Sequence, residues 1–138
     1  MAKTYNIFIS HSWSYADAYE KLKNLLDNRP YFSYIDYSIP KDDPVHTKGT
    51  DRELSEAIYN KMRPCHIVLI MAGVYSTYSK WINKEIRIAK KQFINPKPIV
   101  GIKPWAQTNV SSVVNDNSDK LVGWNKESIV SAIKECAI

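Results

Sequence analysis

Residues 65–71 read Cys-His-Ile-Val-Leu-Ile-Met, and this largely apolar run decides the fold. A run of this length is typical of a central strand that helices cover on both faces. Shorter β-like runs occur at 5–10, 31–36, 98–102 and 120–123, and amphipathic stretches with helical spacing separate them. This alternation predicts an α/β domain with a mainly parallel sheet.

Capping signals mark where the helices between these strands begin. Ser14 is expected to begin the first helix and Asn125 the last. Thr50 and Glu53 have the spacing of a capping box at the start of another helix. Five strands interleaved with helices predict a flavodoxin-like sheet of order 2-1-3-4-5 in a single domain, residues 1–138.

Two segments lack the patterning of a helix or a strand. Residues 37–49 carry prolines, aspartates and a glycine, which predicts a loop that is long for an α/β connection. Residues 104–118 are polar and poorly periodic, so we expect an irregular segment there with at most one short helical turn.

An acid stands out on the helix predicted to follow a turn at residues 72–79. Trp81 and Glu85 lie four positions apart and therefore share one side of that helix. Glu85 falls at the shoulder of the apolar stripe, and the positions three and four residues away from it hold no cation. A carboxylate beside a Trp- and Ile-rich surface is costly without a local partner, which makes Glu85 a functional candidate. The structural alternatives are a glutamate in water or one paired with a distant lysine.

The predicted strand order gives this acid a location. The switch point of a 2-1-3-4-5 sheet lies at the C-terminal ends of strands one and three, where such folds bind ligands. The segments expected there are Ser10-His11-Ser12-Trp13 and residues 72–76, and the Glu85 helix follows the second directly. The serine hydroxyls are expected to cap the following helix, or alternatively to donate hydrogen bonds to a ligand's phosphates.

Composition and motifs argue against several other functions. A hydrophobic content of 44% and a charged content of 24% are those of a soluble globular protein, and the apolar runs are too short for a membrane helix. No apolar signal segment begins the chain, so we expect a cytoplasmic protein. The four glycines form no dinucleotide-binding or Walker motif, and the histidines and two cysteines have no metal-ligand spacing, so no metal site is expected.

The net charge of +5 is spread along the chain. Lys90, Lys91, Lys97 and Lys103 come nearest to a cluster, and we interpret them as part of a solvated basic surface, with a site for a phosphate-bearing small ligand as the alternative. No nucleic-acid reader motif accompanies them, so nucleic-acid binding is not expected.

Three features in sequence order carry a resemblance to a known family. Residues 5–12, Tyr-Asn-Ile-Phe-Ile-Ser-His-Ser, resemble the first box of Toll/interleukin-1 receptor (TIR) domains. The long proline-containing loop before Thr50 resembles their BB loop, and Trp81-x-x-x-Glu85 resembles the helix that carries the catalytic glutamate in NAD-cleaving members. In detail the chain is similar to the small TIR-like proteins of the bacterial Thoeris antiphage system. It departs from the family at Asn6, where many members have Asp, and in lacking the usual Pro-Gly pair of the loop.

The resemblance implies a flavodoxin-like TIR fold and cleavage of the nicotinamide–ribose bond of NAD. Glu85 would be the catalytic residue, and NAD the substrate, with no further cofactor. The resemblance also implies a cyclic ADP-ribose-type second messenger, which a separate effector protein senses, and self-assembly through TIR surfaces. The substrate pocket is expected to be lined by Ser10, His11, Ser12, Tyr37 and Trp81.

Two other functions remain open at this point. The chain could be a TIR adaptor that only binds other TIR domains, or a nucleotide-binding regulator without turnover. An adaptor has no use for an acid at position 85, and release of nicotinamide from NAD would separate an enzyme from both alternatives.

Overall fold

The computed structural model describes residues 3–10, 18–38, 49–72, 80–103 and 112–138 of the chain. The side chains of residues 18, 80 and 81 are outside this description. The strands are β1 (Thr4–Ile9), β2 (Ser33–Asp36), β3 (Ile67–Met71), β4 (Ile99–Ile102) and β5 (Lys120–Val122). The helices are α1 (Ala18–Asp27), α2 (Asp51–Met62), α3 (Lys80–Lys91), α4 (Ser112–Asn117) and α5 (Lys126–Cys136).

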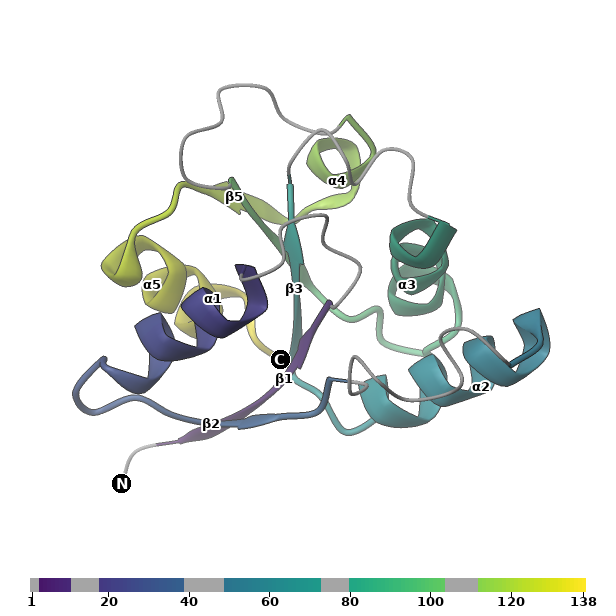
Figure 1. The fold of residues 1–138 in the computed structure, drawn as a ribbon, viewed down its shortest axis with the longest axis horizontal. Helices are drawn as coiled ribbons and strands as arrows, with labels where there is room; N and C mark the ends of the chain where they lie inside the picture. Colours follow the sequence, from purple (N-terminus) through teal and green to yellow (C-terminus); the bar gives the residue numbers. More distant parts are fainter. Residues whose placement is uncertain (1–2, 11–17, 39–48, 73–79, 104–111) are drawn as a thin grey trace.

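The five strands form one sheet of order β2-β1-β3-β4-β5, which confirms the predicted topology. β2 and β5 lie at opposite edges of this sheet (Figure 1). Each of the four strand pairs is parallel, so the sheet is wholly parallel where the sequence predicted a mainly parallel one. In the register, Ile7 pairs with Ile67 across β1 and β3, and Leu69 pairs with Val100 across β3 and β4. The stretch at 65–71 thus supplies the central strand, as predicted.

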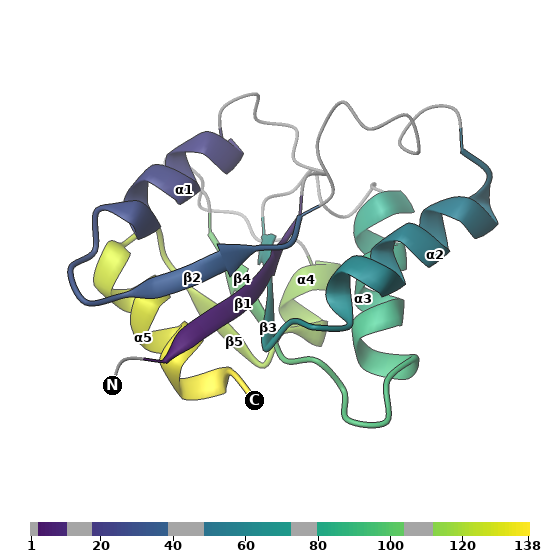
Figure 2. The ribbon, with the colours of Figure 1, turned by 90° about the horizontal axis from the view of Figure 1, so that it is seen from below.

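Helices cover both faces of the sheet, with α1 and α5 on one side and α2, α3 and α4 on the other (Figure 2). Successive side chains of β3 point alternately to the two faces of the sheet. Ile67, Leu69 and Met71 pack under α1 and α5, whereas Val68 and Ile70 pack under the other three helices. This two-sided burial is the reason that β3 lacks the polar alternation of a half-exposed strand.

The helix starts that the structure describes follow the predicted caps. At α2 the Thr50 side chain accepts a hydrogen bond from the Glu53 amide at 3.1 Å, and the Glu53 carboxylate accepts one from the Thr50 amide at 3.2 Å. At α5 the Asn125 side chain accepts from the Ser128 amide at 3.0 Å. The predicted cap at Ser14 lies outside the described residues. The short helix α4 lies in the segment where the sequence predicted at most one turn, and residues 104–111 are also outside the description.

Lys97 departs from the predicted basic surface, because its side chain is only 9% exposed. Its ammonium group donates hydrogen bonds to the carbonyl oxygens of Arg63 and Cys65, both at 2.8 Å, and lies 4.9 Å from the centre of the Phe93 ring. These carbonyls follow the C-terminus of α2, where a cation complements the partial negative charge of the helix end. Burial lowers the pKa of Lys97. The sequence interpretation of Lys97 as a solvated surface residue is therefore wrong.

Candidate functional site

Ser10 lies at the switch point that the strand order defines. It follows β1 directly, its side chain is fully buried, and its amide donates to the carbonyl of Leu69 on β3 at 3.0 Å. Phe8, two positions earlier, packs on the face that α2 and α3 cover. Side chains two apart on extended backbone point to the same face, so Ser10 is expected to point toward the α2–α3 side of the sheet.

Tyr37 lies on the same side of the sheet. It follows the last residue of β2, and its amide donates to the carbonyl of Ile7 at 2.9 Å. Its ring is partly buried against the apolar cluster that includes Phe8, Ile82 and Ile86. Tyr37 and α3 therefore contribute to one packed surface near the C-terminal edge of the sheet.

Glu85 is fully buried, with an exposed fraction of 0%. It lies on α3 between Ile82, Ile86 and Ala89, three apolar side chains that are themselves almost completely buried. A glutamate directed into water, one of the two structural alternatives drawn from the sequence, is therefore excluded. Removing a carboxylate from water is expensive in folding free energy, so a buried acid on the core side of α3 is explained either by a catalytic role or by a structural partner elsewhere in the chain.

Of the six predicted site residues, Tyr37 and Glu85 lie on the α2–α3 side of the sheet, and Ser10 is buried at the end of β1 with its side chain expected to point the same way. Trp81 lies on α3 one turn before Glu85, as predicted, but its side chain is outside the description. His11 and Ser12 lie outside the described residues, so their predicted place in a pocket stays a prediction.

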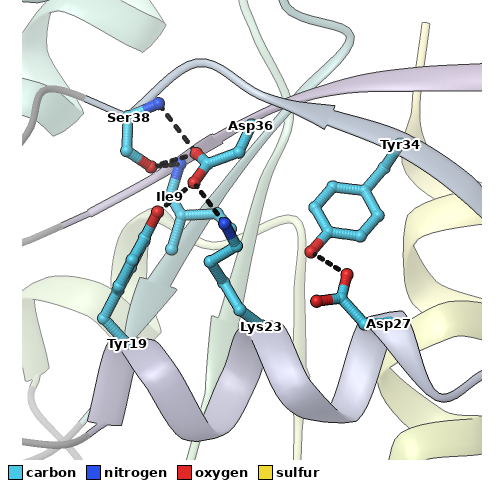
Figure 3. Close-up of polar contacts among 7 residues, drawn as sticks. All are labelled: Ile9, Tyr19, Lys23, Asp27, Tyr34, Asp36 and Ser38. Carbon is cyan, nitrogen blue, oxygen red and sulfur yellow. Dashed lines mark hydrogen bonds and ion pairs between the residues drawn. The ribbon is translucent and has the colours of Figure 1, made fainter.

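A polar cluster around Asp36 was not predicted from the sequence (Figure 3). Asp36 ends β2, and its carboxylate accepts hydrogen bonds from the Tyr19 hydroxyl, the Ser38 hydroxyl and, at 2.8 Å, the Ser38 amide. The ammonium group of Lys23 lies 3.8 Å from the same carboxylate. Burial, together with the hydrogen bond to Asp36, raises the pKa of Tyr19, so this hydroxyl stays protonated and acts as a donor. The sequence signal was an aspartate at the C-terminal end of a predicted strand with a serine two positions on.

Two surface hollows lie along α2 and α3, with volumes of about 270 and 240 Å³. The first is lined by Ser55, Glu56, Tyr59, Asn60 and Gln92, and the second by Asp51, Asn83, Lys84 and Arg87. Neither described lining includes a predicted site residue. Among the residues that the structure describes, no group of three His, Cys, Asp or Glu side chains could hold a metal ion, and no helix is long and apolar enough to cross a membrane.

Comparisons with known proteins place the chain in a family. A search of curated proteins found no match. Among solved structures, the crystal structure of a prokaryotic SEFIR domain is similar, with 16% sequence identity, a TM-score of 0.43, and coverage of 95% of this chain and 94% of that one. Residues 8–109, which are most of the chain, match the family described as the Thoeris protein ThsB, TIR-like domain. The chain therefore belongs to this family of Thoeris TIR-like domains.

Proposed function

We propose that this protein is an NAD-consuming enzyme that cleaves the nicotinamide–ribose bond, with Glu85 as its catalytic carboxylate. The product in this proposal is a cyclic ADP-ribose-type second messenger of bacterial antiphage defence, which a separate effector protein senses. The observation that carries the proposal is the complete burial of Glu85 on the core side of α3, in a member of the Thoeris TIR-like family.

The chemistry of the reaction explains why a buried acid is useful. Loss of nicotinamide leaves a ribose with oxocarbenium character, and a fixed negative charge nearby stabilises that cation in the transition state. The stabilisation is larger in a low-dielectric site than in water. Nicotinamide leaves as a neutral molecule, so the reaction requires no second acid to protonate it.

Whether water is excluded from the pocket determines if the product is cyclic or hydrolysed. If the pocket keeps water from the cationic ribose, a nucleophilic atom elsewhere in the same ADP-ribose can attack it and close a ring. Ile82, Ile86 and Ala89 give Glu85 an apolar environment of the kind such a pocket needs. Exclusion of water by residues of this kind would favour cyclisation over simple hydrolysis.

The same burial has a consequence for activation. A carboxylate with no exposed surface cannot touch a substrate until neighbouring side chains move. We therefore expect the protein in this conformation to be silent, and turnover to follow a rearrangement that opens a path to Glu85. Activity should be assayed both on the purified protein and in phage-infected cells that express it.

The test is Glu85→Gln, which keeps the size of the side chain and removes its charge. Turnover of NAD, measured as nicotinamide release, is expected to fall by about 10²-fold or more, the usual scale for losing one electrostatic group in a catalytic site. Glu56→Gln is the matched control, because it makes the same chemical change at an exposed position of α2.

Melting temperature should be measured on the same preparations. A purely structural Glu85 predicts a lower melting temperature, with activity that tracks the folded fraction. Under conditions in which the wild-type protein consumes NAD, a folded Glu85→Gln protein that consumes NAD at the same rate would refute the catalytic assignment. Unchanged NAD in infected cells that express the wild-type protein would refute the enzymatic function and favour an interaction module.

A further inference from the structure

The cluster around Asp36 joins three elements at the C-terminal edge of the sheet. The two carboxylate oxygens have different partners. Oδ1 accepts hydrogen bonds from the amide and the hydroxyl of Ser38. Oδ2 accepts a hydrogen bond from the Tyr19 hydroxyl and lies near the Lys23 ammonium group, both on α1. The Asp36 side chain is only 15% exposed. Figure 3 shows these groups converging between β2 and the start of α1.

Ser38 extends the cluster to β1. The register of β1 with β2 runs as far as Ile7 opposite Asp36, and two residues further along β1 the amide of Ile9 donates to the Ser38 hydroxyl at 3.2 Å. The Ser38 side chain thus continues the β1–β2 hydrogen bonding beyond the end of β2. A serine hydroxyl has one proton to donate. Because that proton goes to Asp36, the oxygen's lone pairs are left to accept from Ile9.

The residues that make these contacts are adjacent in sequence to two residues of the proposed pocket, Ser10 and Tyr37. Ile9 directly precedes Ser10, and Tyr37 lies between Asp36 and Ser38 in the chain. We propose that Asp36 and Ser38 are positioning residues, which clamp the end of β1 to the end of β2 and so fix Ser10 and Tyr37. This role rests on the proposed function, and neither residue needs to touch the substrate.

The carboxylate itself is poorly suited to bind a ligand. Its two oxygens already accept three hydrogen bonds and face an ammonium group. A ligand hydroxyl would have to displace one of these partners, at the cost of leaving a mostly buried group unsatisfied. A positioning role is the one that the existing contacts favour.

Amide exchange of Ile9 tests the clamp without any assay of activity. Ser38→Ala removes the acceptor of the Ile9 amide, so that amide is expected to exchange roughly 5- to 10-fold faster, the scale of one hydrogen bond. Ser38→Thr retains the hydroxyl and should restore slow exchange. Ile9 exchange that is unchanged in Ser38→Ala would overturn the clamp.

A matched pair of tyrosine variants distinguishes the effect of weakening this cluster from the general effect of losing one hydrogen bond between α1 and β2. The Tyr19 hydroxyl donates to Asp36, and the Tyr34 hydroxyl donates to Asp27. Each of the two pairs links α1 to β2. Tyr19→Phe weakens the Asp36 cluster, whereas Tyr34→Phe removes a contact distant from Ile9 along the helix (Figure 3). We expect faster Ile9 exchange in Tyr19→Phe only. Equal exchange in the two variants would contradict a specific role for the cluster.

Kinetics connect the clamp to catalysis. Under the conditions that activate the wild-type protein, and at temperatures where every variant is folded, Ser38→Ala and Asp36→Asn are expected to lower kcat about 10-fold, because small misplacements of site residues are costly in rate. Asp27→Asn serves as control and should retain the wild-type kcat and KM. Wild-type kinetics in both Ser38→Ala and Asp36→Asn would overturn the positioning role while leaving NAD cleavage intact. A wild-type protein that releases no nicotinamide, whether purified or in phage-infected cells, would refute the proposed function, and Ile9 exchange would still decide whether the clamp exists.

Discussion

Gly101→Ala should destabilise the protein, because β4 passes very close to α4 and β5 at this residue. A Cβ atom at position 101 would lie 2.7 Å from Ser118 Oγ, 2.9 Å from Leu121 Cδ1 and 3.0 Å from Val114 Cγ1. Two of the three neighbours have little freedom to move. Val114 is fully buried, and the Ser118 hydroxyl donates to the Val114 carbonyl.

The expected size follows from two opposing effects. Forcing one extra carbon into a packed region costs about 1–3 kcal/mol. Replacing glycine lowers the conformational entropy of the unfolded chain and offsets about 0.4–1 kcal/mol of this cost. With mid-range values of about 2 kcal/mol for the cost and about 0.7 kcal/mol for the offset, the net loss of unfolding free energy should be about 1–2 kcal/mol. With ~2.1 cal/mol/K of unfolding entropy per residue and a chain of 138 residues, the melting temperature should fall by about 3–7 °C.

Urea denaturation and thermal melts monitored by circular dichroism measure both quantities. Gly123→Ala is the matched control, since a Cβ there meets nothing within 4 Å, and its stability should equal or slightly exceed that of the wild type. The reasoning is wrong if Gly101→Ala melts at or above the wild-type temperature, or if the two alanine variants lose stability equally.

Two further predictions concern the segment that follows the C-terminus of α2, which Lys97 contacts and to which His66 belongs. Lys97→Met should lower the unfolding free energy by about 1–3 kcal/mol, because the carbonyls of Arg63 and Cys65 lose their donor; urea denaturation at neutral pH measures this, and a fully stable variant would contradict it. His66 Nδ1 accepts from the Asn6 amide at 2.9 Å, and burial, with Lys3 and Lys97 adding to it, lowers the His66 pKa below its ordinary value of 6.5. Stability from this group is therefore complete above pH 6.5 and is lost as the pH falls through the lower folded-state pKa. His66→Asn, which retains an acceptor but does not titrate, should flatten the pH dependence of stability in this range, and an unchanged profile would refute the assignment.

The fold was predictable because its main determinants are local in the sequence. The apolar run at 65–71 identified β3, and the alternation of strand-like and helix-like stretches around it fixed a parallel α/β sheet. The capping box at Thr50 and Glu53 was visible from the spacing of the two residues, and the cap at Asn125 from the type of residue that precedes the helical stretch. The strand order followed from the fold class once the elements were counted.

The candidate site was only partly predictable, because its polar contacts join distant parts of the chain. Glu85 could be identified from the apolar residues on its own helix, but its complete burial depends on the packing of other elements. The Asp36 cluster combines residues 17 positions apart with one that reaches back to Ile9, which no periodicity reveals. Lys97 was misjudged for the same reason, since its acceptors lie 32 and 34 positions earlier.

The central position of β3 also sets the order of events while the chain is being synthesised. β1 pairs with β3 at Ile7 and Ile67, and the chain between them contains α1, β2 and α2. A ribosome that adds about 5–20 residues per second needs roughly 3–12 s to make this intervening stretch. During that time Phe8 and Ile9, which are fully covered in the finished domain, lack the strand that buries them. We therefore expect the nascent chain to be a chaperone client at least until β3 has emerged, and to gain full protease resistance only after β4 and α5, which complete the core around Ile9, have also emerged.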